Sequence, residues 1–133
     1  MEKKYTEAVG RRKTAVARVR MTPAAKTTIT VGEKTLEQYF GVSELIRVAS
    51  EPLEKLEGEA PQAYTITVKV SGGGTHAQAE AIRHGISRIL VKEDETIKAT
   101  LKKFGFIKRD PRAKERRKFG LRKARKAPQW SKR

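Results

Sequence analysis

The sequence predicts an α+β fold, with a globular body over residues 1–107 followed by an extended basic tail over residues 108–133. Three observations predict it. Apolar and polar residues alternate in several short segments, which is typical of half-buried strands. Between residues 75 and 91 apolar residues recur at helical spacing. The last 26 residues follow neither period and are strongly basic.

Two strands are expected to open the chain as a hairpin, Lys3–Val9 and Thr14–Met21. In the second, small apolar residues alternate with polar ones, so Arg18 and Arg20 share one face of the strand. The segment Gly10–Lys13 lies between the strands and is expected to be a four-residue hairpin turn.

A third, short strand is expected over Thr28–Val31. Apolar residues at i, i+3 and i+4 then predict a short helix over residues 36–40, which Gly41 stops. Ser43 is the expected N-cap of a second short helix. Pro52 is expected to restart or kink that helix.

The strongest strand signal is Tyr64–Val70, which runs into the glycine triplet Gly72–Gly74 and then into a long helix from about Thr75 to Val91. Gly85 in the middle of this helix indicates close packing or close approach. The core-facing stripe of the helix consists of Ile82, Ile86, Ile89 and Leu90.

A last helix is expected from about Glu95 to Phe104, ended by Gly105, before the tail begins. The tail holds thirteen basic and two acidic residues, which leaves +11 of the total +16. Such a segment cannot bury enough apolar area to offset its ordering entropy, so alone it should be disordered. A nucleic acid changes that balance, because binding to phosphates releases counterions. Fully extended, the tail reaches about 80 Å.

Composition excludes several classes of protein. There is no cysteine, hence no disulfide framework or thiolate metal site, and the two histidines, His76 and His84, are too few for a His-only site. No apolar run approaches the length of a membrane span, and the N-terminus lacks a signal-peptide core. We therefore expect a cytosolic protein that associates with nucleic acid, without metal, cofactor or small-molecule substrate.

Both histidines are expected to lie at the surface or to take part in packing. A solvated acidic face is expected at Glu51, Glu54, Glu57 and Glu59.

In the body, three adjacent cations at the predicted turn, Arg11, Arg12 and Lys13, favour phosphate contact because Arg18 and Arg20 lie just beyond them. The alternative is a solvated turn that keeps the hairpin soluble. The glycine triplet has two equal interpretations. Its N–H groups and the helix N-terminus contact a phosphate, or the glycines let helix and sheet pack closely.

Taken together, the motifs closely resemble the bacterial type of the small-ribosomal-subunit protein S-nine family. The resemblance covers nearly the whole chain. The matching segments are Gly10–Thr14, Ala17–Arg20, Gln38–Phe40, Gly72–Gly74, Ala81–Ile86, Arg109–Arg112, Gly120–Arg125 and Ala127–Arg133.

The resemblance implies a sheet of about four strands backed by helices, like the second domain of ribosomal protein S-five, with a left-handed βαβ crossover. The general rule favours a right-handed one. It also implies a place in the head of the small subunit, bound to its rRNA and beside other head proteins. The tail then reaches the anticodon stem-loop of the P-site tRNA through Ser131, Lys132 and Arg133, and the protein has no catalytic activity.

On this interpretation basic residues of the body, the glycine triplet and the tail contact rRNA, and Phe119 and Trp130 stack on bases. The expected rRNA contacts are Arg11, Arg12, Lys13, Arg18, Arg20, Gly72, Gly73, Gly74, Arg83, Arg109, Arg112, Arg116, Arg117, Lys118, Arg122, Lys123, Arg125 and Lys126.

Two other classes stay open. One is a small enzyme that acts on phosphorylated substrates through the glycine triplet, an idea that rests on fold analogy alone. The other is a non-specific DNA-binding protein, which composition does not separate from an RNA-binding one.

Overall fold

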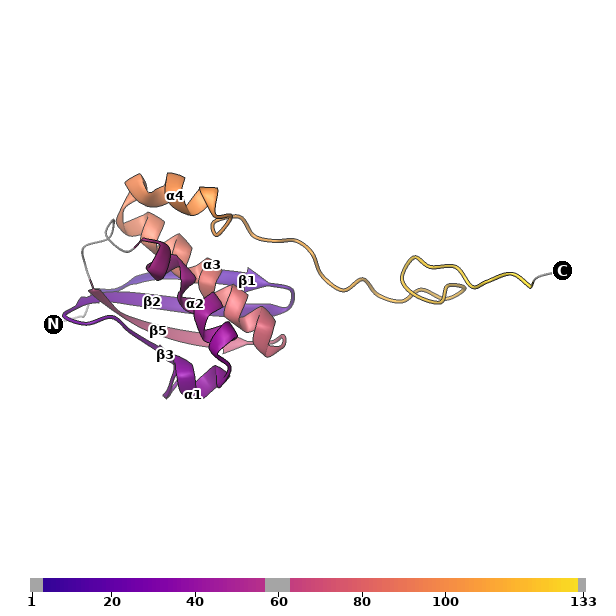
Figure 1. The fold of residues 1–133 in the computed structure, drawn as a ribbon, viewed down its shortest axis with the longest axis horizontal. Coiled ribbons are helices and arrows are strands. Elements are labelled where there is room, and N and C mark those ends of the chain that lie inside the picture. The colour runs from indigo at the N-terminus through magenta and orange to yellow at the C-terminus, as the bar shows by residue number, and fades with distance from the viewer. Residues whose placement is uncertain (1–3, 57–62, 132–133) are drawn as a thin grey trace.

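The computed structural model describes residues 4–56 and 63–131 of the chain (Figure 1). The strands are β1 Thr6–Arg12, β2 Ala15–Ala24, β3 Thr28–Val31, β4 Lys34–Thr35 and β5 Ala63–Ser71. The helices are α1 Leu36–Phe40, α2 Ser43–Lys55, α3 Thr75–Glu93, the 3-10 helix η1 Glu95–Ile97 and α4 Lys98–Lys103. The α+β prediction is confirmed.

The strands form one mixed sheet in the order β1-β2-β5-β3-β4. β2 pairs antiparallel with both β1 and β5, whereas β3 and β5 are parallel. α1 and α2 therefore lie in a crossover between β3 and β5. In Figure 1 both strands run from left to right, β5 lies above β3, and the helices pass in front of the sheet. That path is left-handed, as the family resemblance implies.

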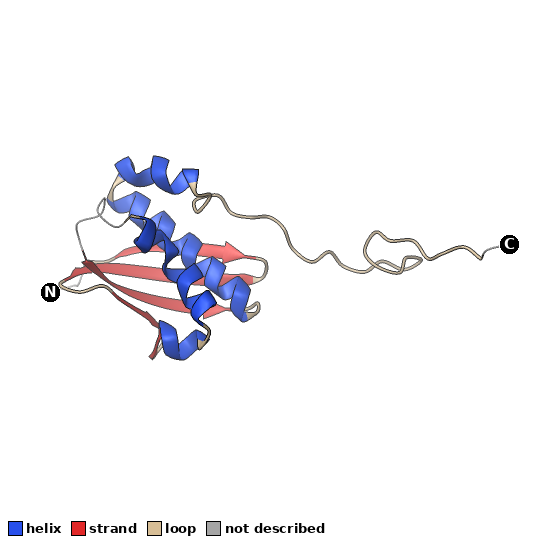
Figure 2. Ribbon diagram, in the orientation of Figure 1, coloured by secondary structure: helices blue, strands red, loops and turns tan. Residues whose placement is uncertain are grey.

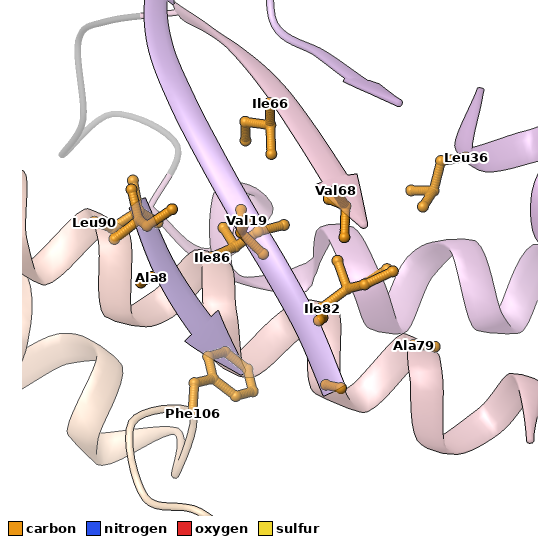
Figure 3. Packing of buried hydrophobic residues seen from close by; sticks show 14 of the residues in the cluster. Ala8, Val19, Leu36, Ile66, Val68, Ala79, Ile82, Ile86, Leu90 and Phe106 are labelled. Carbon is orange, nitrogen blue, oxygen red and sulfur yellow. The ribbon is translucent and has the colours of Figure 1, made fainter. Parts of the chain in front are cut away.

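The helices cover one face of the sheet, and the core lies between these two layers (Figure 2). Val19 from β2 and Ile66 and Val68 from β5 point toward the stripe on α3 (Figure 3). The alternation predicted for β2 is confirmed, because its small apolar residues are almost fully buried. Arg18 and Arg20 consequently lie on the face that the helices leave uncovered.

The expected four-residue turn at Gly10–Lys13 is wrong. β1 continues to Arg12, which pairs with Ala15, so only Lys13 and Thr14 connect the strands. Lys13 has φ 52°, the left-handed region that a tight two-residue turn requires. Three of the four residues assigned to the turn therefore lie in a strand, and their side chains alternate between directions instead of projecting together.

Other boundaries also differ. Val42, not Ser43, is the N-cap of α2, and α2 is one helix that contains Pro52 near its end. The helix expected to end at Phe104 is divided into η1 and α4. The two-residue strand β4 was not expected. α1, its stop at Gly41, and α3 are confirmed.

Beyond α4, the described residues up to Ser131 form neither helix nor strand. In Figure 2 this segment leaves the body at the end of the sheet where β1 and β2 are joined, and it extends far beyond the body. Within residues 4–56 and 63–131, no helix is both long and apolar enough to cross a membrane.

Candidate nucleic-acid interface

The first group of candidate residues lies at the end of the β1–β2 hairpin. Arg11 and Lys13 are exposed, and within the described part of the chain neither side chain has a carboxylate partner. Arg12 points differently: its side chain is only 11% exposed and pairs with Glu80 and Asp110. Of the three adjacent cations, two are thus free to meet a phosphate and one is neutralised within the protein.

The second group lies on the uncovered face of the sheet. The side chain of Arg18 donates a hydrogen bond to the Glu7 carboxylate, and Arg20 Nε lies 3.2 Å from the same carboxylate. The bond from Arg18 holds the pKa of Glu7 below its usual value. Arg18 also faces Lys69 directly across the β2–β5 pairing. Two like charges opposite each other destabilise a sheet, so they favour an anionic partner.

Sequence reasoning missed Lys69. The alternation along β5 placed it on the polar face of the strand, and that was the available signal. Its position beside Arg18 depends on the register of two strands about fifty residues apart, which the sequence pattern does not specify.

The glycine triplet lies beside the hairpin turn. Gly72 and Gly73 have φ values of 71° and 67°, in the region that favours glycine. A Cβ on Gly72 would lie 2.6 Å from the Thr14 carbonyl oxygen, and one on Gly73 would lie 2.8 Å from the Ala15 Cβ. These contacts support the close-packing interpretation of the triplet. Its contact with phosphate stays a prediction.

Gln78 fixes the triplet from the side of α3. Its Nε2 donates to the Gly72 carbonyl at 3.0 Å, and its Oε1 accepts from the Tyr39 hydroxyl at 2.5 Å. The triplet and α1 are therefore tied to one side chain of α3.

Arg83 has partners inside the protein. Its Nη1 lies 3.3 Å from the Glu51 carboxylate, and its guanidinium lies over the Phe106 ring at 5.1 Å. This half-buried side chain links α2, α3 and the segment after α4. Its expected contact with rRNA stays a prediction, and Glu51 is occupied by this pair and is not merely solvated. Glu57 and Glu59 lie outside the described residues.

His84 serves packing, as expected. The Arg11 amide donates to its Nδ1 at 3.2 Å, and its Nε2 lies 2.9 Å from the Ile107 carbonyl. A neutral ring with its hydrogen on Nε2 satisfies both contacts. Burial lowers the pKa of His84 below its usual value, partly opposed by the bond to Ile107 and assisted by nearby arginines. His76 is exposed at the start of α3, and its Nδ1 lies 3.7 Å from Glu80.

The third group is the tail. Among its described residues, Lys118 and Arg125 pair with Glu115, and Arg112 pairs with Asp110. Phe119 and Trp130 are almost fully exposed, as stacking on bases would require. Ser131 is exposed, while Lys132 and Arg133 lie outside the described residues. The tail cations without a carboxylate partner in the described chain are Lys108, Arg109, Lys114, Arg116, Arg117, Arg122, Lys123 and Lys126.

The arrangement suits binding to a polyanion along an extended path. In the part of the chain that the structure describes, no group of three or more His, Asp or Glu is placed to hold a metal ion. The sequence model of a family described as ribosomal protein S9/S16 matches residues 10–133. That match includes the hairpin end, the triplet, α3 and the whole tail.

Proposed function

The chain belongs to the ribosomal protein S9/S16 family, and from this premise we propose that its body contacts rRNA in the head of the small subunit while its tail reaches the P-site tRNA. Membership makes the chain a structural, rRNA-binding constituent of the small ribosomal subunit, located in the ribosome in the cytoplasm. Its partners are rRNA and ribosomal proteins. The family is structural and non-enzymatic, which does not favour a nucleotide-binding enzyme built on the triplet.

The observation that carries the tRNA proposal is the isolation of the tail. Beyond Arg112, every hydrogen bond of the described tail residues is to another tail residue. Its free cations are thus not committed to the body, and the chain is long enough to act far from it. Contact with backbone phosphates is independent of base sequence, as a site that accepts every elongator tRNA requires.

Within the rRNA-binding set, we assign the largest share of phosphate contact to the unpaired cations. Among the described residues Arg11 and Lys13 have no ion pair to lose, whereas Arg18 and Arg20 share Glu7. A cation that must leave an internal carboxylate gains less from a phosphate than a free one.

Removal of Ser131–Arg133 tests the tail proposal. We expect small subunits with this deletion to assemble normally and to release P-site tRNA a few-fold faster, because one or two phosphate contacts add to a much larger interface. The measurement is the dissociation rate of tRNA from purified subunits carrying messenger RNA.

A matched variant keeps the length of the tail but replaces Lys132 and Arg133 by glutamine. If charge is the cause, it behaves like the deletion. If tRNA dissociates at the parental rate from both variants, the proposed contact between the tail and P-site tRNA is wrong.

A further inference from the structure

The tail does not leave the body directly after α4. Residues 106–112, here called the tail root, are held at several points. Phe106 is buried, its amide donates to the Leu101 carbonyl at 3.2 Å, and Arg83 lies over its ring. The Ile107 carbonyl accepts from His84. The tail root therefore has a defined course across α3 and the hairpin.

Arg12 holds the far end of the tail root. Its Nε donates to Glu80 Oε2 on α3 at 2.5 Å. Its Nη1 donates to the Arg112 carbonyl at 2.5 Å, and its Nη2 lies 3.6 Å from Asp110 Oδ2. All three nitrogens of the planar guanidinium face partners, and these partners come from α3 and from the tail.

Asp110 shapes the root locally. It accepts from the Arg112 amide at 2.9 Å and from the Arg112 guanidinium at 2.8 Å. These bonds, chiefly those from the Arg112 side chain, hold the pKa of Asp110 well below its usual value. The carboxylate is therefore charged at neutral pH and stays available to Arg12.

We propose that Arg12 is a positioning residue that locks the tail root onto the hairpin and α3, and so fixes the direction in which the tail leaves the body. Its burial and its two carboxylate neighbours disfavour the phosphate contact that the sequence suggested. Its neighbours Arg11 and Lys13 have exposed side chains with no carboxylate partner among residues 4–56 and 63–131.

The consequence for function rests on the proposed reach of the tail to tRNA. Fixing residues 106–112 shortens the free segment from 28 to 21 residues of the 133-residue chain. By length alone this raises the effective concentration of the tail end by only about 1.5-fold. Direction is thus the larger contribution of the lock, because it excludes every path that leads away from the binding partner.

The first test measures the tail root in the free protein. The chain has no cysteine, so Thr67→Cys on β5 and Lys114→Cys beyond the root place two spin labels without background. We expect a narrow distance distribution in the parent. Arg12→Gln and, separately, Glu80→Gln should each broaden it at least twofold, whereas Arg11→Gln should leave it unchanged.

A second measurement separates positioning from phosphate contact. The association constant for a transcript of small-subunit rRNA is measured at several salt concentrations. Arg11→Gln should reduce the slope of log K against log salt by about 0.7–0.9, the value for one lost phosphate contact. Arg12→Gln should leave that slope unchanged.

Two results would overturn the proposal: a distance distribution in Arg12→Gln as narrow as in the parent, or a salt slope that falls as much in Arg12→Gln as in Arg11→Gln. Thermal unfolding of each variant confirms that it is folded. Because the distance measurement contains no tRNA, its outcome is independent of the tRNA-release experiment. If Arg12 locks the tail root but the tail does not contact tRNA, Arg12→Gln broadens the distance distribution while the tail deletion leaves tRNA release unchanged. If the tail contacts tRNA without a lock, the deletion speeds tRNA release while the distance distribution in Arg12→Gln stays narrow.

Discussion

At Gly10 the backbone of β1 touches the backbone of α3. A Cβ on Gly10 would lie 1.9 Å from the Ala81 carbonyl oxygen, and one on Gly85 would lie 2.6 Å from Val19 Cγ2. The clash at Gly10 is with main-chain atoms of α3, so it cannot be relieved by rotating a side chain and would require the strand or the helix to shift. We expect Gly10→Ala to lower the free energy of unfolding by about 3 kcal/mol, measured by denaturant unfolding.

Gly41 provides the comparison. It ends α1 with φ 68°, and nothing lies within 4 Å of a Cβ built there. Gly41→Ala should therefore lower the free energy of unfolding by only about 1 kcal/mol, the cost of holding alanine in the left-handed backbone conformation. Equal losses at the two positions would mean that close approach is not the reason for glycine at position 10.

His84 gives the fold a dependence on pH. Its folded pKa is depressed below 6.5, chiefly by burial, so the unfolded chain binds the proton more readily. The free energy of unfolding is then constant above about pH 6.5 and decreases as the pH falls from there to the folded pKa. The slope is at most about 1.4 kcal/mol per pH unit.

The matched variants are the two histidines. Thermal unfolding between pH 7.5 and 5 should lose this slope in His84→Gln and keep it in His76→Gln, because His76 is exposed. If the pH dependence of stability persists in His84→Gln, a group other than His84 binds the proton on unfolding.

At the scale of elements, α3 protects the outer edge of β1. His84, Arg88 and Lys92 are spaced four residues apart and so project from one side of α3. They contact alternate residues of the strand, at the Arg11 amide, the Val9 carbonyl and the Glu7 carbonyl. An exposed sheet edge invites pairing with another chain. Here side chains of one helix fill the positions that a sixth strand would occupy.

We predict that the cations on the uncovered face of the sheet lower the stability of the fold and contribute to rRNA binding. Lys69 lies opposite Arg18, and like charges in that position are unfavourable. Lys69→Thr should therefore raise the free energy of unfolding by roughly 0.2–0.5 kcal/mol. It should also lower the salt slope of rRNA binding by about 0.7–0.9.

Lys34→Thr is the control for this prediction, because Lys34 is an exposed cation on the edge strand β4, two strands away from β5. We expect it to change neither quantity measurably. A Lys69→Thr protein that is stabilised but binds with the parental salt slope would leave the sheet face without a role in rRNA contact.

The sequence predicted elements more reliably than their ends. The stripe on α3 and the alternation in β2 are long periodic signals, and both elements are confirmed. The turn at Gly10 was misjudged because glycine also serves close packing, and only the tertiary contact with Gly85 distinguishes the two uses. β4 has two residues, too few to show any period.

At the scale of the whole molecule, charge is divided unequally between the body and the tail, which carries +11 of the total +16. Composition predicted the basic tail directly, but not which cations are free. Arg12 and Arg11 are adjacent and alike in sequence, yet one is neutralised by Glu80 and Asp110 and the other is exposed. Such differences arise from residues about seventy to one hundred positions away, so no local pattern contains them.

This division makes a prediction for a chain that ends at residue 112. The removed segment holds ten basic residues and one acidic residue, so it carries +9 of the total +16. Because its described residues bond only to one another, the body should keep its folding energy, with a thermal midpoint within about 2 °C of the parent. If half of the ten cations meet phosphates, the salt slope of rRNA binding should fall by about 4.

Ending the chain at residue 107 separates the tail root from the rest of the tail. That shorter chain also loses the contacts of Arg12 with Asp110 and the Arg112 carbonyl, which leaves Arg12 partly unpaired. Its thermal midpoint should be lower than that of the chain ending at 112, and its salt slope should fall by up to about 1.8 more if Lys108 and Arg109 both contact phosphates. Equal midpoints for the two chains would mean that the root adds nothing to the body. The tail would then begin functionally at residue 108, as the composition alone suggested.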